Sequence, residues 1–252
     1  MPKNIITVTD LTKRYGKDTT VDSISFTVKE GEVFGILGPN GAGKTTTLEM
    51  IEALRPIDDG EVILDGVSVT EQPDKVKENI GIQLQTTAFF DKLNLREQLR
   101  MFASLYGETA DPDELLADVQ LTEKADEYVE NLSGGQRQRF SIAAALVNQP
   151  RVLFMDEPTT GLDPQARRNL WDLVRDIKSK GITVVLTTHY MDEAELLCDR
   201  IAIMDSGKIL TINTPKKLVK ELLARGFTKK QEVEKANLED VFIDLTGKAI
   251  RD

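Results

Sequence analysis

A glycine-rich segment that carries a single lysine constrains the fold of this chain more than any other feature. Residues 38–45 match the pattern G-x-x-x-x-G-K-[ST] at every position. The apolar run from Val33 to Leu37 before it is typical of a strand buried on both faces. The residues after it predict a helix from Lys44 to about Leu54. A strand, a glycine-rich turn and a helix in this order indicate an α/β fold with a phosphate-binding loop.

The residue types of this loop suit the binding of a nucleotide's phosphates. Glycines allow backbone N–H groups to surround phosphate oxygens, and the helix that follows directs its positive end at them. Lys44 can reach the β- and γ-phosphates, and the Thr45 hydroxyl can bind Mg²⁺. A glycine-rich turn that contains a lysine by chance is the alternative, and the flanking strand and helix disfavour it. The predicted ATP-binding residues here are Gly38, Pro39, Asn40, Gly41, Ala42, Gly43, Lys44, Thr45 and Thr46.

Two adjacent acids follow a second apolar run. Val152 to Met155 precedes Asp156 and Glu157. The end of a buried parallel strand lies at the carboxyl edge of the sheet, where ligands bind in open α/β folds. Asp156 is therefore predicted to hold Mg²⁺, and Glu157 to orient or deprotonate a water near the γ-phosphate. An ordinary acidic turn after a strand is the alternative, and the loop at 38–45 disfavours it.

The remaining pattern alternates between strands and helices, which predicts a parallel sheet covered by helices. Residues 93–147 read as mainly helical. Asp163 and Pro164 are typical of the N-cap and the first position of a further helix. The predicted strands are 5–8, 24–28, 33–37, 61–64, 152–155, 183–187 and 201–204.

Composition excludes several classes of protein. The chain has 252 residues, 40% hydrophobic and 29% charged, which is typical of a globular domain. Asp and Glu number 42 against 32 Lys and Arg, a formal charge of −10 that disfavours binding to nucleic acid. The longest uninterrupted apolar stretch, 142–147, falls far short of the roughly 20 residues of a membrane span. No secretory signal is expected at the N-terminus. The one cysteine and one histidine exclude disulfides within the chain and Cys- or His-rich metal sites.

The sequence Leu-Ser-Gly-Gly-Gln at 132–136 lies between the loop and the acidic pair. By residue chemistry alone it is a helix N-terminus with free N–H groups and a hydroxyl, and a plain N-cap with flexible glycines fits equally well. In this position, however, it resembles the signature of the ATP-binding-cassette (ABC) ATPases. The resemblance covers nearly the whole chain. It implies that Ser133, Gly134, Gly135 and Gln136 bind ATP.

The resemblance implies roles for further residues. Tyr15 matches the aromatic residue that stacks on adenine, although an ordinary core aromatic is the alternative. Gln85 matches the glutamine that contacts Mg²⁺ and the water, and the nearby Gln83 is left open as the alternative. Asp163 matches a residue at the dimer interface. His189, the only histidine, matches the catalytic switch histidine beside the γ-phosphate.

The resemblance also implies an architecture and a mechanism. The fold class is α/β: a P-loop NTPase core with a parallel sheet, an N-terminal antiparallel β subdomain and an inserted α-helical subdomain. The chain is expected to be one ABC ATPase domain, 1–252. Its core is expected at about 1–85 and 150–225, the helical subdomain at about 86–149 and a tail at about 226–252. Two cassettes, alike or different, would pack head to tail around ATP and separate after hydrolysis.

Several stretches resemble the bacterial drug, antibiotic and polysaccharide exporter branch of the family: 87–93, 188–195 and 238–242. This resemblance implies an ATPase that drives export through a separate transmembrane permease subunit. The chain is expected in the cytoplasm, peripheral at the inner face of the cell membrane and held there only by its partner. A soluble ABC-type ATPase in cofactor assembly is the alternative, and a P-loop kinase is strongly disfavoured.

A surface for the membrane partner is expected just after Gln85. Phe89, Phe90, Leu93 and Leu95 lie close together at the start of the helical region. They predict a partly exposed apolar groove that receives a short helix from the permease. A purely structural role for the two adjacent aromatic residues is the alternative.

Overall fold

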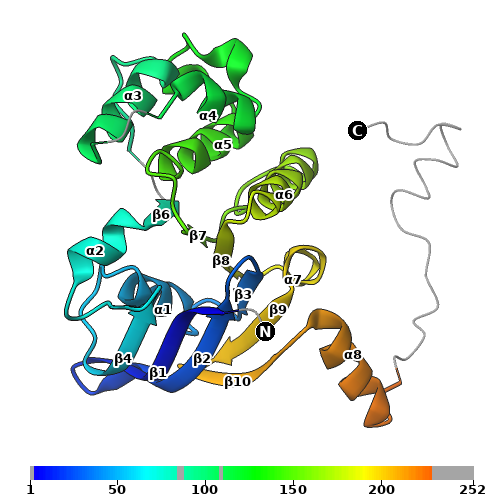
Figure 1. The fold of residues 1–252 in the computed structure, drawn as a ribbon. Coiled ribbons are helices and arrows are strands. Elements are labelled where there is room, and N and C mark those ends of the chain that lie inside the picture. The colour runs from blue at the N-terminus through cyan, green and yellow to red at the C-terminus, as the bar shows by residue number, and fades with distance from the viewer. Residues whose placement is uncertain (1–2, 84–87, 108–109, 229–252) are drawn as a thin grey trace, which may run out of the picture. The chain divides into compact units, whose positions relative to one another are not determined.

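The computed structural model describes residues 3–83, 88–107 and 110–228 of the chain. The chain divides into two compact units, Met1–Lys217 and Leu218–Asp252. The elements that surround the loop at 38–45 all belong to the first unit (Figure 1). Gln85 and the tail residues 238–242 lie outside the described residues. The division into subdomains proposed above therefore stays a prediction.

A six-stranded sheet with the order β10-β9-β3-β8-β7-β6 positions the loop and the acidic pair. The strands β9, β3, β8, β7 and β6 run parallel, and β10 is antiparallel at one edge. Every residue of β3, β7 and β8 is buried, which explains their short, continuous apolar runs. The predicted α/β fold class is confirmed. The bounds are β3 Val33–Leu37, β6 Ile80–Gln83, β7 Val152–Asp156, β8 Thr183–Thr188, β9 Arg200–Asp205 and β10 Lys208–Asn213.

A second, antiparallel sheet has the order β2-β1-β4-β5. Its strands are β1 Asn4–Tyr15, β2 Asp18–Lys29, β4 Asp59–Leu64 and β5 Val67–Ser68. The first two strands are much longer than the predicted 5–8 and 24–28. Their pairing contains register shifts, at Leu11 and Lys13 among others, which interrupt the alternation of apolar and polar residues that the prediction used. Phe26 of this sheet stacks on Phe34 of β3, with ring centroids 5.4 Å apart, so the two sheets share one core.

Helix α1 begins at Lys44, directly after the loop, and it ends at Ile51 and not near Leu54. Helix α6 begins where it was predicted to begin: the Asp163 side chain accepts a hydrogen bond from Ala166 N at 2.8 Å, and Pro164 is the first helical residue. The remaining bounds of this part are α2 Pro73–Glu78, α6 Pro164–Ser179 and α7 Met191–Leu197.

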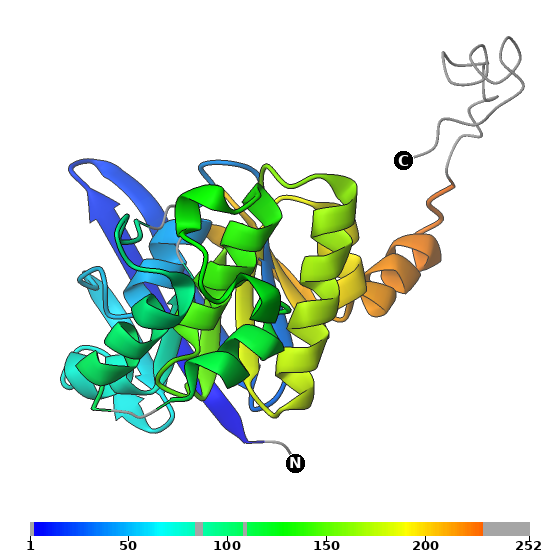
Figure 2. The ribbon, with the colours of Figure 1, turned by 90° about the horizontal axis from the view of Figure 1, so that it is seen from above.

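Residues 95–107 and 110–145 form a group of helices, shown in green, that lies away from the antiparallel sheet (Figure 1). In the view from above, the same helices lie in front of the strands (Figure 2). Helix α5 begins at the Gly134-Gly135 pair, and its carboxyl half is buried. The bounds are α3 Leu95–Leu105, α4 Pro112–Asp118, η1 Thr122–Lys124, η2 Val129–Asn131 and α5 Gly134–Ala145. Helix α8, Pro215–Ala224, crosses the boundary between the two units in sequence.

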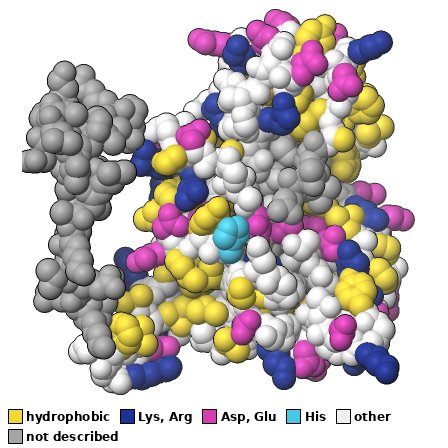
Figure 3. Space-filling model, turned by 180° about the vertical axis from the view of Figure 1, so that it is seen from behind, with side chains coloured by type: hydrophobic (Ala, Val, Ile, Leu, Met, Phe, Trp, Pro, Cys, Tyr) yellow, Lys and Arg dark blue, Asp and Glu magenta, His cyan; other side chains and the backbone are white. Residues whose placement is uncertain are grey.

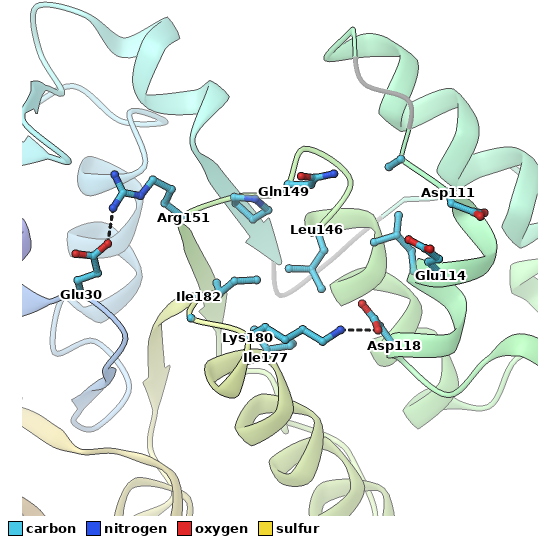
Figure 4. Close-up of a pocket in the computed structure, with 14 residues that line it drawn as sticks. Glu30, Asp111, Glu114, Asp118, Leu146, Gln149, Arg151, Ile177, Lys180 and Ile182 are labelled. Atoms are coloured by element: carbon cyan, nitrogen blue, oxygen red, sulfur yellow. Dashed lines mark hydrogen bonds and ion pairs between the residues drawn. The ribbon is translucent and has the colours of Figure 1, made fainter.

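A cavity of about 420 Å³ separates α4 from the sheet (Figure 4). Arg151 and Ile182, which directly precede β7 and β8, line it, so it lies at the amino edge of the sheet. The ion pair between Lys180 Nζ and Asp118 Oδ1, at 2.5 Å, joins the end of α6 to α4 here. This edge is opposite the one that carries the loop. Over the described residues, the helices are all too short or too polar to cross a membrane.

Candidate functional site

The loop at 38–45 connects the carboxyl end of β3 to the first turn of α1, and its glycines are required by close backbone contacts. A Cβ atom on Gly38 would lie 2.2 Å from the carbonyl oxygen of Met204. Gly43 has a φ of +99°, and a Cβ atom there would lie 2.6 Å from the carbonyl oxygen of Thr20. Glycine alone fits both positions without a shift of the backbone. The sequence therefore folds the loop tightly over the end of the sheet.

The loop opens into a pocket of about 310 Å³. Lys44, Thr45 and Thr46 of α1 line one part of it, and Glu157, which follows β7, lines another. Segments more than 100 residues apart thus meet at one cavity. The other lining residues are Thr20, Asn40, Gly41 and Gly43.

Lys44 is a buried cation that is already surrounded by oxygen atoms. Its Nζ donates hydrogen bonds to the carbonyl oxygens of Gly38 at 3.0 Å and Pro39 at 3.1 Å. It also lies 3.2 Å from Oε1 of Glu157. Only 4% of the Lys44 side chain is exposed, so its charge needs an anionic partner. A phosphate oxygen that enters the pocket would be a further anionic partner for Lys44.

Asp156 is held by two threonine hydroxyls from different elements. Thr45 Oγ1 donates to Asp156 Oδ2 at 3.0 Å, and Thr187 of β8 donates to Oδ1. A hydroxyl and a carboxylate side by side are hard oxygen ligands of the kind that Mg²⁺ takes together with water and phosphate. In the part of the chain that the structure describes, no cluster of three or more His, Cys, Asp or Glu forms a complete metal site. Thr45 and Asp156 therefore fit a Mg²⁺ that arrives with the nucleotide.

Glu157 has a backbone φ of +48°, which is unusual for a residue with a side chain. Its amide N–H donates to Thr187 Oγ1 at 3.0 Å, and this contact fixes the turn after β7. Thr160 Oγ1 donates to its carboxylate at 3.3 Å. Backbone strain of this kind is concentrated at functional sites, where the surrounding structure holds it in place.

The protonation of Glu157 follows from its neighbours. Burial alone raises the pKa of Glu157, but the hydrogen bonds and charges of Lys44 and His189 lower it, and the net pKa is below the usual value. His189 Nδ1 lies 3.2 Å from Glu157 Oε2. The carboxylate is therefore ionised at neutral pH, as an acceptor of a proton from water must be.

His189 follows directly after β8, at the same edge of the sheet as Asp156 and the loop. The histidine side chain is visible at the surface beside acidic side chains (Figure 3). Its ring also packs on Tyr190, with centroids 4.1 Å apart. The structure thus brings together Lys44, Thr45, Asp156, Glu157 and His189.

The residues at 133–136 lie elsewhere, at the N-terminus of α5. Ser133 Oγ accepts from Gln136 N at 3.3 Å, and Gln136 Oε1 accepts from Ser133 N at 2.9 Å, so the two form a capping box. A Cβ atom on Gly135 would lie 2.9 Å from Ala166 Cβ of α6. Of the residues described around the Lys44 pocket, none comes from this segment.

The structure also places three other residues that the sequence analysis named as candidates: Tyr15, Asp163 and Gln83. Tyr15 ends β1 and is 43% exposed. Asp163 caps α6. Gln83 ends β6 and is buried, whereas Gln85 lies outside the described residues. The choice between these two glutamines therefore stays open.

Thr187 is a site residue that the sequence reasoning missed. Its hydroxyl contacts both Asp156 and the backbone of Glu157, and it is fully buried. A sequence signal exists: two threonines, Thr187 and Thr188, follow the apolar residues Val184, Val185 and Leu186 at the end of β8. A polar pair at the carboxyl end of a central parallel strand points to the ligand-binding edge.

A glycine-rich loop before a helix, with a lysine, a threonine and an acidic pair on a nearby strand, defines a P-loop NTPase. The family model described as "ABC transporter" matches residues 21–160. The chain belongs to this family.

Two relatives and one solved structure support the assignment. The chain is 43% identical to the linearmycin resistance ATP-binding protein LnrL of Bacillus subtilis (strain 168), over 84% of this chain and 70% of the relative. It is 41% identical to the Nod factor export ATP-binding protein I of Ralstonia nicotianae, over 85% of this chain and 68% of the relative. It also resembles the solved structure of a dimeric ATP-binding cassette bound to ADP and phosphate. The TM-score is 0.74 and the sequence identity 27%, and the match covers 83% of this chain and 98% of the other.

Proposed function

We propose that this chain binds ATP with Mg²⁺, hydrolyses the ATP, and thereby drives export of a substrate through a separate transmembrane permease subunit. The observation that carries the proposal is the contact of Glu157 with both Lys44 and His189 at the mouth of the loop. A carboxylate base that lies beside both a cation and a histidine suits the hydrolysis of a γ-phosphate.

Each residue has a role that its position supports. The loop and Lys44 hold the β- and γ-phosphates. Thr45 and Asp156 are the residues that would hold Mg²⁺, which neutralises charge on the phosphate oxygens when it is bound. Glu157 accepts a proton from the attacking water, and His189 donates a hydrogen bond to the γ-phosphate. Gln85 or Gln83 would contact the ion and the water.

The catalytic site is proposed to be completed by a second cassette, a copy of this chain or a related one. Ser133 and Gly135 lie at the start of α5, outside the pocket that surrounds Lys44. In a head-to-tail dimer they would meet the γ-phosphate held by the partner's loop, and Asp163 would lie at the interface. The dimeric cassette described above, with its ADP and phosphate, supports such an arrangement.

An apolar groove is the proposed surface for the permease. It has a volume of about 400 Å³, and Phe89, Phe102 and Leu105 are among the residues that line it. Leu105 is 76% exposed, as suits a surface that a partner covers. Phe90 does not line the groove, but it is 53% exposed and its ring centroid lies 6.3 Å from that of Phe102, which does. Two other residues that the sequence analysis assigned to this groove do not line it: Leu93 is partly buried, and Leu95 is fully buried in the helical core.

The export direction is supported by the relatives, one of which is named for linearmycin resistance and the other for Nod factor export. The cassette would then lie on the cytoplasmic side of the membrane and be held there by the permease. The groove favours this interpretation over a soluble ATPase in cofactor assembly.

The proposal is tested with purified protein by measuring ATP binding and ATP turnover in Lys44→Ala. The lost ammonium faces the phosphates, so we expect turnover to fall by about 100-fold or more. Lys208→Ala removes an exposed lysine that pairs with Asp22 and serves as the control. Equal turnover in wild type and Lys44→Ala would contradict the assignment of this pocket.

A further inference from the structure

Arg55 lies just beyond the end of α1, and its guanidinium group joins two side chains from different elements. Nη1 donates a hydrogen bond to the Tyr15 hydroxyl oxygen at 2.5 Å, and Nε donates to Glu49 Oε2 at 2.5 Å. Its Cζ atom is 5.6 Å from the centroid of the Tyr15 ring. Glu49 belongs to α1, the helix that begins with Lys44 and Thr45. One arginine thus connects the predicted adenine-stacking residue to the helix of the phosphate-binding loop.

Backbone contacts fix Arg55 itself. Its amide N–H donates to the carbonyl oxygen of Glu49 at 3.0 Å, which closes the chain around the end of α1. The path of the chain after Arg55 is held against β1 as well. Lys13 Nζ donates to the carbonyl oxygen of Pro56 at 2.8 Å and to Asp58 Oδ1 at 2.7 Å. The backbone of Arg55 is therefore held in place, and its guanidinium is tied to Glu49 and Tyr15.

Tyr15 needs such a support because it is the last residue of β1 and 43% of it is exposed. An exposed aromatic side chain samples several rotamers, and a ligand that stacks on it loses affinity in fixing one of them. A hydrogen bond from a charged donor to the phenol oxygen selects one orientation before the ligand arrives. Lys13 Nζ also lies 5.7 Å from the centroid of this ring, so a base would stack on the part of the ring that is exposed to solvent.

We infer that Arg55 is a positioning residue that holds Tyr15 ready for the base of the bound nucleotide, at a spacing from the phosphate loop that α1 sets through Glu49. This inference rests on the proposed stacking of adenine on Tyr15. It concerns the base end of the nucleotide alone, because the contacts of Arg55 given above involve none of the residues that line the phosphate pocket.

The test compares ADP with inorganic diphosphate, since both present phosphates but only ADP presents a base. Calorimetry of Arg55→Ala is expected to give ADP affinity weakened about three- to tenfold, as for the loss of one hydrogen bond. The affinity for diphosphate should stay within about twofold of the wild type. Arg14→Ala is the matched control: Arg14 is the neighbour of Tyr15, but its guanidinium pairs with Asp59. It should change neither affinity.

Tyr15→Phe and Tyr15→Ala complete the experiment. Tyr15→Phe keeps the ring and the fold but removes the acceptor of the Arg55 hydrogen bond, so it should weaken ADP binding as Arg55→Ala does. Combined with Tyr15→Ala, Arg55→Ala should have no further effect on ADP affinity. Additive losses, or an equal loss of ADP and diphosphate in Arg55→Ala, would overturn the positioning role. If Tyr15→Ala leaves the ratio of the two affinities unchanged, the proposed stacking fails, and the inference fails with it.

Discussion

Lys44 Nζ lies 3.2 Å from Glu157 Oε1, so the cation of the phosphate loop and the predicted catalytic base form one ion pair. Both side chains are largely shielded, with 4% and 12% of their surfaces exposed. A buried ion pair holds its geometry because either charge alone would be costly to bury. The loop lysine therefore positions the base.

Glu157→Gln is predicted to separate ATP binding from ATP hydrolysis. The amide keeps the shape of the side chain but cannot accept the proton of the water, and the rate should fall about 100-fold or more. Bound ATP should then persist and hold two cassettes together. Size-exclusion chromatography with ATP and Mg²⁺ measures the dimer. A mutant that elutes only as a monomer would count against the sandwich arrangement.

Ser133→Arg is predicted to block turnover while ATP still binds to the mutant's own loop. Ser133 caps α5 away from the Lys44 pocket, so nucleotide affinity should change by less than about threefold. Its large side chain would obstruct the γ-phosphate site of a partner cassette. Nucleotide binding and turnover are measured on the same sample. A parallel loss of both would show that Ser133 acts within its own subunit.

Phe90→Ser is predicted to uncouple ATP hydrolysis from transport. Phe90 is 53% exposed, so the free energy of unfolding should change by less than about 1 kcal/mol, and soluble ATPase activity should remain. Binding to the permease and transport in vesicles should be lost. Phe89→Ser changes a residue that lines the groove itself, and its ring centroid lies 4.9 Å from that of the buried Phe140, so this change should in addition destabilise the fold by about 1–3 kcal/mol. Undiminished transport by Phe90→Ser would exclude Phe90 from the docking surface.

Glu52→Gln is predicted to make stability less sensitive to pH. Burial, with added repulsion from Asp156 and Glu49, raises the pKa of Glu52 to about 8. Between the ordinary pKa of about 4.5 and this raised value, Glu52 keeps its proton in the folded state and has lost it in the unfolded state. Stability is therefore lost as pH rises from about 4.5 to 8, by at most about 1.4 kcal/mol per pH unit. Urea titrations of wild type and mutant at pH 5.5 and pH 8 measure this, and an identical pH dependence would refute it.

The sequence predicted the catalytic edge of the sheet well because that edge depends on local rules. Continuous apolar runs identified β3 and β7, and the residues after each run had to lie at the carboxyl edge. The N-cap at Asp163 was equally local, since an acceptor side chain followed by proline identifies a helix start without knowledge of the fold.

Contacts between segments that are distant in the sequence were harder to predict. Nothing near Thr187 in the sequence says that β8 lies between β3 and β7, so its bond to Asp156 required the strand order. The long strands β1 and β2 were underestimated because register shifts hide the twofold pattern. Leu95 was wrongly assigned to the groove because the sequence pattern is the same for an apolar residue in a groove and for one in a core. Only the packing of the folded chain distinguishes the two.

The central place of β8 has a consequence for the changes that this chain can tolerate. Thr187 is paired with Ile36 of β3 and with Asp156 of β7, and the carbonyl oxygen of Thr188 accepts from Gly38 N at 3.3 Å. One residue inserted between Thr183 and Leu186 would put Leu186 opposite Asp156 and turn every later side chain to the other face. Asp156 and the Glu157 amide would then lose, in one step, the Thr187 hydroxyl that both of them contact. Strand β8 can therefore exchange one apolar side chain for another, but its length is fixed.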